Sequence, residues 1–97
     1  MAQEIHSGTR TAPTAGTAVR LSSTRKDARW VQVQAMSTNT GTVTVRGVGE
    51  GGGVVMTAYG GFLFPSMGDN PHYNLKEIEL VASVSGEGVN LLWYAGE

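Results

Sequence analysis

The alternation of apolar and polar residues predicts a chain of short β-strands. Over residues 29–35 the pattern has a period of two, so successive side chains point to opposite faces. One face carries Val31, Val33 and Ala35, and the other carries Trp30, Gln32 and Gln34. No long segment places apolar residues at the i, i+3, i+4 and i+7 spacing of a helix. The chain is therefore expected to be all-β.

Two β-hairpins are predicted from the turns that follow the clearest strands. The first covers residues 29–46, where Ser-Thr-Asn-Thr-Gly at 37–41 supplies residues that tolerate positive φ. The second covers residues 78–94, where Ser-Gly-Glu-Gly at 85–88 reverses the chain. Its last strand is apolar on both faces, which predicts a central strand or one covered by another subunit.

The remaining segments complete a single-domain β-sandwich, jelly-roll-like, with about seven short antiparallel strands. Shorter strands are expected at 16–21, 54–58 and 62–64, separated by glycine-rich turns. Residues 1–15 are polar apart from a lone Ile5, and we expect them to form an extended N-terminal arm. The predicted organisation is an arm over 1–15 and a sandwich domain over 16–97.

Composition excludes several classes of function. The chain has 97 residues, 14 glycines, no cysteine and a net charge of −1. Without cysteine there is no disulfide scaffold, cysteine-ligated zinc or thiol catalysis. The near-zero charge argues against nucleic-acid binding, and no apolar run is long enough to cross a membrane. The amino terminus lacks the pattern of a secretory signal, so we expect synthesis in the cytoplasm.

Charge is unevenly distributed along the chain. Residues 1–48 carry a net charge of +4, and residues 49–97 carry −5. In a sandwich the two halves interleave, which would mix these charges in space. If the separation persisted, it would favour head-to-tail or layered association.

The candidate catalytic and ligand-binding patterns have simpler explanations. Residues 47–52 match G-x-G-x-x-G but are followed by a β-like segment, so a flexible glycine loop is expected instead of a dinucleotide site. His6 and His72 lack nearby metal ligands, and Asp69 lies in the same turn as His72. Glu77 and Glu79 are predicted to lie on a solvated strand face. We expect no enzyme activity, cofactor or metal.

The placement of the aromatic residues leaves several possibilities open. Trp30 and Tyr94 are predicted to face away from the core, and Phe62 and Phe64 flank Leu63 before a proline. Such aromatics close a barrel, stack on sugar or anchor a subunit interface. A second sheet layer could equally cover them.

Two segments resemble small accessory virion proteins of tailed bacteriophages. Residues 30–35 and 39–45 read WVQVQA and NTGTVTV, similar to the V-x-I-x-A…N-T-G-x-V-x-V-G hairpin of these proteins. Arg46 stands where a glycine often follows the last valine. Residues 75–80 and 88–94 resemble the closing hairpin of the same proteins. Together the two segments cover about half of the chain.

The resemblance implies a decoration or cement protein on the outside of a phage head. Such proteins commonly sit as trimers or dimers at lattice symmetry axes, with amino-terminal arms lying across neighbouring capsomers. The implied partners are the major capsid protein lattice and further copies of this chain, as a homotrimer or a dimer. The implied location is the capsid surface of the virion.

Two sets of contact residues are predicted on this basis. The capsid-contacting arm is expected to use Glu4, Ile5, Arg10 and Pro13. Self-association or lattice contacts are expected at Trp30, Tyr59, Phe62, Phe64, Leu92 and Tyr94. A carbohydrate-binding domain of a tail fibre or spike, with Trp30 and Tyr59 stacking on sugar, is an alternative function. A neck or tail component is another.

Overall fold

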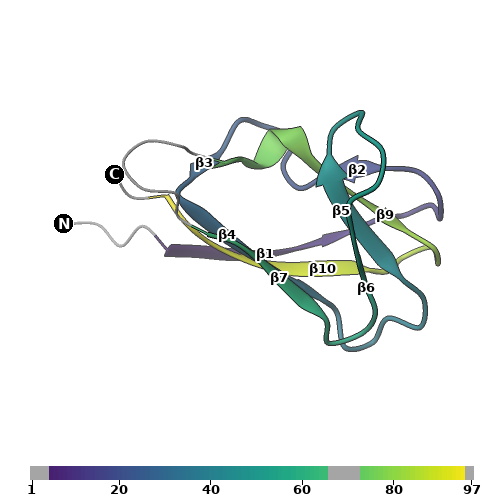
Figure 1. The fold of residues 1–97 in the computed structure, drawn as a ribbon. Helices are drawn as coiled ribbons and strands as arrows, with labels where there is room; N and C mark the ends of the chain where they lie inside the picture. The colour runs from purple at the N-terminus through teal and green to yellow at the C-terminus, as the bar shows by residue number, and fades with distance from the viewer. Residues whose placement is uncertain (1–4, 66–72, 96–97) are drawn as a thin grey trace.

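Two four-stranded antiparallel sheets pack face to face (Figure 1). The computed structural model describes residues 5–65 and 73–95. In spatial order, sheet A contains β1 (Ile5–Thr11), β10 (Gly88–Tyr94), β4 (Trp30–Ala35) and β7 (Gly61–Phe64). Sheet B contains β2 (Val19–Arg20), β9 (Ile78–Ala82), β5 (Val43–Gly47) and β6 (Val54–Met56). The all-β sandwich prediction is confirmed.

A third, two-stranded sheet closes one end of the sandwich. It pairs β3 (Asp27–Ala28) with β8 (Tyr73–Asn74). A single 3-10 turn, η1 (Leu75–Glu77), connects β8 to β9, and the Asn74 side chain caps it by accepting from the Lys76 amide. The described residues therefore form ten strands, against the predicted seven. β3 and β8 are too short for periodicity to reveal them, and β1 was expected to be part of an arm.

The strand order is that of a jelly roll. Two connections, from β2 to β4 and from β7 to β9, pass between the main sheets through the strands of the third sheet. Four more pass directly, from β1 to β2, β4 to β5, β6 to β7, and β9 to β10. These four connections lie at one end of the sandwich, on the right in Figure 1. Among the eight main strands, only β5 and β6 are both consecutive and paired. Such crossing between two sheets is the double Greek-key arrangement of jelly rolls.

Both predicted hairpins are wrong, although their strands are present. β4 pairs with β10 and β7, and β5 pairs with β9 and β6. The 36–42 loop therefore arches across the core from sheet A to sheet B. The 83–88 loop likewise joins β9 in sheet B to β10 in sheet A. A period of two places apolar side chains inward equally well for paired strands and for strands that face each other across a sandwich.

The amino-terminal segment is part of the sandwich. Residues 5–11, expected to be an extended arm, form the edge strand β1 and pair with β10 over seven positions. Ala12, which follows, is completely buried. The backbone groups of β1 gain ladder hydrogen bonds that a free arm would leave to water, and this outweighs the polar composition of the segment. The prediction of a free arm is corrected for these residues.

The core lies between the two sheets and consists mainly of small β-branched and aliphatic residues. The side chains predicted to share one face of β4 are all buried: Val31, Val33 and Ala35. Val43 and Val45 of β5, in the opposite sheet, are also buried. Leu80 and Val89 face them from β9 and β10 and are fully buried. β10 lies between β1 and β4, so the central-strand interpretation of its two apolar faces is confirmed.

Hydrogen bonds between loops hold the crossing end of the sandwich together. The Glu87 carboxylate accepts from the Thr40 amide at 2.6 Å, the Thr40 hydroxyl at 2.8 Å and the Gly41 amide at 2.9 Å. The buried Asn39 amide group donates to the Gly88 carbonyl and accepts from the Gly88 amide. The Ala12 amide in turn donates to the Glu87 carbonyl. Three loops are thus joined at one point.

Glycine is required at position 88 because β1 approaches very closely. A Cβ at Gly88 would collide with the Arg10 carbonyl and the Thr11 Cα. We expect Gly88→Ala to lower the free energy of unfolding by about 2–3 kcal/mol, since the clash involves backbone that cannot rotate away. Gly51→Ala is the matched control, because a Cβ there meets nothing within 4 Å. Equal urea midpoints for the two variants would contradict this packing.

The Glu87 contacts predict acid-dependent stability. The Thr40 and Gly41 amides, helped by the Thr40 hydroxyl, hold the pKa of Glu87 below its ordinary value. A lowered folded-state pKa stabilises the protein above the ordinary glutamate pKa of about 4.3, and this stabilisation is lost as pH falls through the folded-state pKa. The melting temperature of Glu87→Gln should therefore lie below that of the wild type at neutral pH.

The difference between the two melting temperatures should narrow in acid. Differential scanning calorimetry across the pH range measures it directly. Glu50→Gln, which removes the same charge from the glycine loop, is the control for net charge. A difference that stayed constant from neutral pH down to about pH 3 would show that the ionised carboxylate does not stabilise the loop.

Candidate functional site

The outer hydrogen-bonding side of β1, called here the open edge, is the longest uncovered strand edge among the described residues. The Ala12 amide donates to the Glu87 carbonyl, next to the β1–β10 ladder. Along an antiparallel strand every second residue bonds to the same neighbour, so the even-numbered residues of β1 direct their backbone N–H and C=O groups toward β10. The odd-numbered residues, Ile5, Ser7, Thr9 and Thr11, therefore direct their N–H and C=O groups outward. The open edge is a row of main-chain donors and acceptors without a strand beside it.

The other three edge strands of the two main sheets are much shorter. β7 has four residues and is followed by Pro65, β6 has three and β2 has two. Short edges and prolines are devices by which proteins avoid pairing with other chains. β1 has seven residues and contains no proline, lysine or acidic residue. Its single arginine, Arg10, donates to the Arg20 carbonyl at 2.7 Å. The open edge thus lacks these protections.

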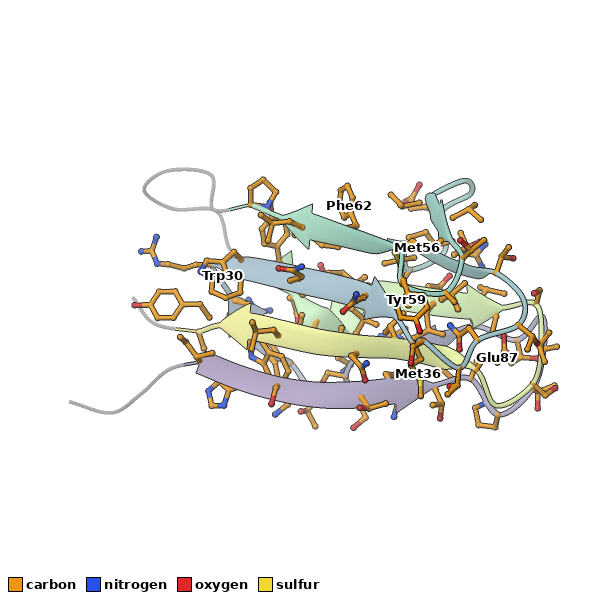
Figure 2. The ribbon with its side chains drawn as sticks, turned by 90° about the horizontal axis from the view of Figure 1, so that it is seen from below. Trp30, Met36, Met56, Tyr59, Phe62 and Glu87 are labelled. Carbon is orange, nitrogen blue, oxygen red and sulfur yellow. The ribbon has the colours of Figure 1, made fainter. Side chains whose placement is uncertain are left out.

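The solvent-facing side of sheet A forms a second distinctive surface, called here the neutral face. Strand register places thirteen positions on it: Ile5, Ser7, Thr9, Thr11, Trp30, Gln32, Gln34, Gly61, Leu63, Gly88, Asn90, Leu92 and Tyr94. None of these strand residues is charged. Ile5, Leu63 and Leu92 are each at least 40% exposed. Figure 2 looks onto this face.

Trp30 and Tyr94 are cross-strand neighbours at the end of the neutral face where β1 begins. Their rings stack with centroids 6.2 Å apart and planes 26° apart. A shallow hollow of about 320 Å³ lies beside Trp30, lined also by Gln32, Leu63 and Pro65. The prediction that Trp30 and Tyr94 face away from the core is confirmed.

Tyr59 lies at the other end of the same face, in the turn between β6 and β7. The Gln34 side chain, which points outward from β4, donates to the Tyr59 carbonyl at 3.4 Å. Tyr59 is 72% exposed and has a φ of +69°, the only described non-glycine residue with positive φ. In this turn the Gly60 amide donates to the Thr57 carbonyl, so Tyr59 occupies the position where glycine or asparagine is usual.

The residues expected to contact a capsid are only partly gathered on these surfaces. Ile5 and Arg10 lie in β1, whereas Pro13 lies in the exposed turn after it. Glu4 lies outside the described residues. The arrangement of these residues as an arm is wrong, but Ile5 and Arg10 do flank the open edge.

The residues expected to mediate self-association are divided between two faces. Trp30, Leu92 and Tyr94 share the neutral face, and Tyr59 borders it. Phe62 and Phe64 instead pair in register with Val33 and Val31, on the core side of sheet A. There they form an edge-to-face cluster with Tyr73, with ring centroids 5.0 and 5.3 Å apart. Leu63, not either phenylalanine, faces outward from β7.

The outer side of sheet B carries charge, in contrast to the neutral face. Arg20, Glu79 and Arg46 form a row across β2, β9 and β5. The Arg46 guanidinium donates to Glu79 at 2.7 Å, and Glu79 is buried. The expectation of a solvated Glu79 is therefore wrong, because the arginine compensates its burial. This ion pair also joins the basic and acidic halves of the chain, which interleave as the sandwich arrangement requires.

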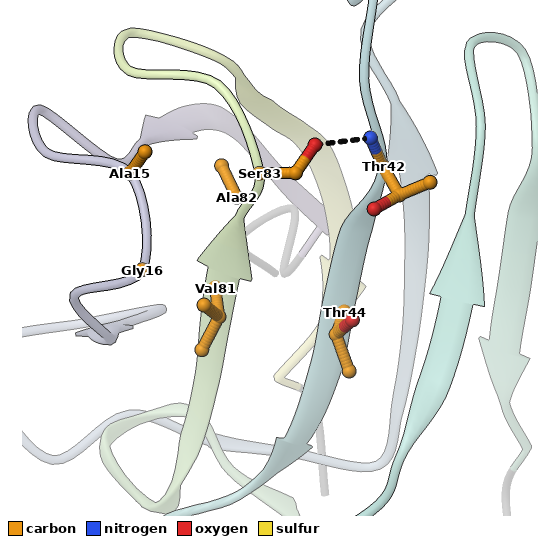
Figure 3. A pocket seen from close by; sticks show the side chains of 7 residues that line it. All are labelled: Ala15, Gly16, Thr42, Thr44, Val81, Ala82 and Ser83. Carbon is orange, nitrogen blue, oxygen red and sulfur yellow. Dashed lines mark hydrogen bonds between the residues drawn. The ribbon is translucent and has the colours of Figure 1, made fainter.

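The described residues offer little for catalysis. A hollow of about 390 Å³ on the outside of sheet B is lined by Ala15, Gly16, Thr42, Thr44, Val81, Ala82 and Ser83, and none of these side chains is an acid, base or metal ligand at neutral pH (Figure 3). His6 stacks on Trp93 in β10. Asp69 and His72 lie outside the described residues. Within the described ranges, no group of three histidine, cysteine or acidic residues could hold a metal ion.

The glycine loop at residues 47–53 is a connection between two strands and not a dinucleotide site. It joins β5 to β6, so a strand and not a helix follows the G-x-G-x-x-G pattern at 47–52. The helix amino terminus that a dinucleotide site needs is therefore not formed there.

No helix within residues 5–65 and 73–95 is long and apolar enough to cross a membrane. Neither a family model nor a curated protein nor a solved structure matches this chain.

The strained conformation of Tyr59 predicts a stabilising substitution. A left-handed backbone costs a non-glycine residue about 1–2 kcal/mol, and glycine avoids this cost at the expense of some unfolded-state entropy. We expect Tyr59→Gly to raise the free energy of unfolding by about 0.5–1 kcal/mol. Ala58→Gly, one residue earlier and without positive φ, should lower it by a similar amount. Destabilisation by both substitutions, measured in urea, would show that the tyrosine ring stabilises the turn.

Proposed function

We propose that this protein is a non-enzymatic phage virion protein that decorates and stabilises the capsid exterior. The open edge of β1 is the observation that carries the proposal. It is a long, unprotected strand edge on a jelly roll whose other main-sheet edges are short, and such edges accept a strand from another protein. The bacteriophage resemblance of the 30–45 and 75–94 segments supplies the identity of that protein, the major capsid protein.

The proposed mechanism is β-strand addition. An extended segment of the capsid protein pairs with β1, taking the outward N–H and C=O groups of residues such as Ser7 and Thr9 into its own ladder. Main-chain hydrogen bonds of this kind provide affinity, while outward side chains at alternate positions provide specificity. Sheet A would then continue into the lattice as a five-stranded sheet.

Repetition over a capsid makes a modest contact effective. Each decoration protein that bridges neighbouring capsomers engages more than one site, so the second contact forms at high effective concentration. Oligomerisation as a trimer or dimer at a symmetry axis would strengthen this effect. The oligomeric state stays a prediction from the bacteriophage resemblance.

The open edge is best tested by proline substitution at an outward position. Ser7→Pro removes one outward donor but leaves the β1–β10 ladder intact, because the Ser7 N–H points away from β10. We expect Ser7→Pro to weaken binding to empty, matured phage heads by about tenfold or more, through the lost donor and the bulk of the ring. Ser7→Ala, the matched control, keeps the donor and should bind like the wild type. Co-sedimentation with heads measures both.

A fold check and a second site keep this test decisive. Circular dichroism should show the same β-spectrum for Ser7→Pro and Ser7→Ala. Thr9→Pro, compared with Thr9→Val, repeats the experiment two residues along the same edge. Head binding by both proline variants at the level of their controls would rule out strand addition at β1.

A further inference from the structure

The neutral face combines aromatic rings at both ends with hydrogen-bonding side chains between them. Trp30 and Tyr94 stack at one end, and Tyr59 lies exposed beyond the far end of β4 (Figure 2). Gln34, the residue that contacts the Tyr59 turn, lies four residues after Trp30 along β4. At the rise of a β-strand this separation is about 13 Å, which is the length of a short oligosaccharide.

Amide and hydroxyl side chains occupy the space between the aromatic residues. Gln32 and Gln34 project from β4, and Asn90 lies opposite Gln34 on β10. The Thr9 hydroxyl donates to the side-chain oxygen of Asn90 at 2.9 Å, a bond that does not use the Asn90 amino group. Amide side chains both donate and accept hydrogen bonds. They therefore match the hydroxyl groups of a sugar, which do the same.

The hollow beside Trp30 suits a ring-shaped group. It measures about 320 Å³, with Trp30 as one wall, Gln32 contributing an amide, and Leu63 and Pro65 completing the lining. This is within the size range of small-ligand sites, and its mixture of one aromatic wall and one amide is typical of them. A pyranose ring offers a C–H face to the indole and hydroxyls to the amide.

The absence of charge from this face indicates an uncharged ligand. None of its thirteen outward strand positions is acidic or basic, although the outer side of sheet B carries Arg20, Glu79 and Arg46 in one row. An acidic polysaccharide, a phosphate or a nucleic acid would require cations that the neutral face lacks. An apolar protein partner would bury Gln32, Gln34 and Asn90 without compensating hydrogen bonds. A neutral glycan can satisfy these amides.

The backbone of Tyr59 gives independent support for a binding role. Its positive φ is unfavourable for tyrosine, and the 72% exposed ring has little packing to compensate it. Glycine, which has no side chain to strain this conformation, is the residue that such a turn position normally favours. Retention of an exposed aromatic at a strained position is explained if the ring contacts a ligand.

We propose that the neutral face binds a linear, uncharged polysaccharide that lies along β4 from Trp30 to Tyr59. Trp30 and Tyr59 stack on sugar rings at the two ends, and Gln32, Gln34 and Asn90 bind the hydroxyls between them. This function is separate from docking at the open edge, because β4 lies inside sheet A with β10 between it and β1. The glycan surface would remain accessible on a protein held by its edge.

Isothermal titration of the full chain against defined hexasaccharides tests the proposal. The probes are cellohexaose, maltohexaose and hexa-N-acetylchitohexaose, with hexagalacturonate as the acidic comparison. At least one neutral hexasaccharide should bind saturably at probe concentrations up to about 1 mM, with an affinity that salt does not change. No binding of any neutral probe, or tighter binding of the acidic one, would overturn the proposal.

Matched variants locate the site. Trp30→Ala and Tyr59→Gly should each weaken glycan binding by about three- to tenfold, and Trp30→Phe should restore part of the loss. Tyr59→Gly is informative because it should fold more stably and yet bind less well. Val55→Ala removes an exposed apolar side chain from the opposite sheet and should bind normally. Equal affinity of all four variants would contradict the assignment.

Sedimentation decides between the glycan and a second copy as the occupant. If the free chain is a dimer that Trp30→Ala converts to monomer, the neutral face is a subunit interface and the proposal fails. A monomer, or an oligomer that Trp30→Ala leaves unchanged, keeps the face free for the glycan and supports the assignment.

Discussion

The contacts of Glu87, Asn39 and Gly88 are the constraint on which the rest of the structure depends. A jelly roll sends its chain repeatedly across the core, and each crossing loop leaves backbone groups that no neighbouring strand can satisfy. Here the side chains of Glu87 and Asn39 make five hydrogen bonds at these loops. Glu87 accepts from Thr40 and Gly41, and Asn39 bonds to the backbone of Gly88. Gly88 permits β1 to approach the same point. Together they fix where β10 enters sheet A.

The two proposed binding surfaces follow from the placement of β10. It lies between β1 and β4, so β1 becomes the outermost strand and its second side stays open. The same placement aligns Leu92 and Tyr94 with the outward side chains of β4. An edge and a face of one sheet thus have different chemistry. The edge offers main-chain groups suited to another strand, whereas the face offers rings and amides without charge.

The sequence was sufficient to predict most of the strands but not which strands pair with one another. The period of two correctly predicted the buried face of β4 and the outward position of Trp30. The two apolar faces of β10 left a central strand and a subunit contact as alternatives, and the strand is central. It could not distinguish a hairpin from an arch, because alternation specifies only which side faces the core. The polar composition of residues 5–11 concealed β1, whose stability comes from ladder hydrogen bonds instead of apolar burial. The strained φ of Tyr59 had no sequence signal beyond the glycine that follows it.

Hydrogen–deuterium exchange at single-residue resolution tests most directly whether β1 accepts a strand from the capsid. In the free protein, the amides of His6, Gly8 and Arg10 face β10 and should exchange slowly, whereas those of Ser7 and Thr9 face outward and should exchange rapidly. Labelling on phage heads, followed by dissociation and fragmentation, should show Ser7 and Thr9 newly protected. Unchanged rapid exchange of these two amides in the head-bound protein would contradict strand addition at the open edge.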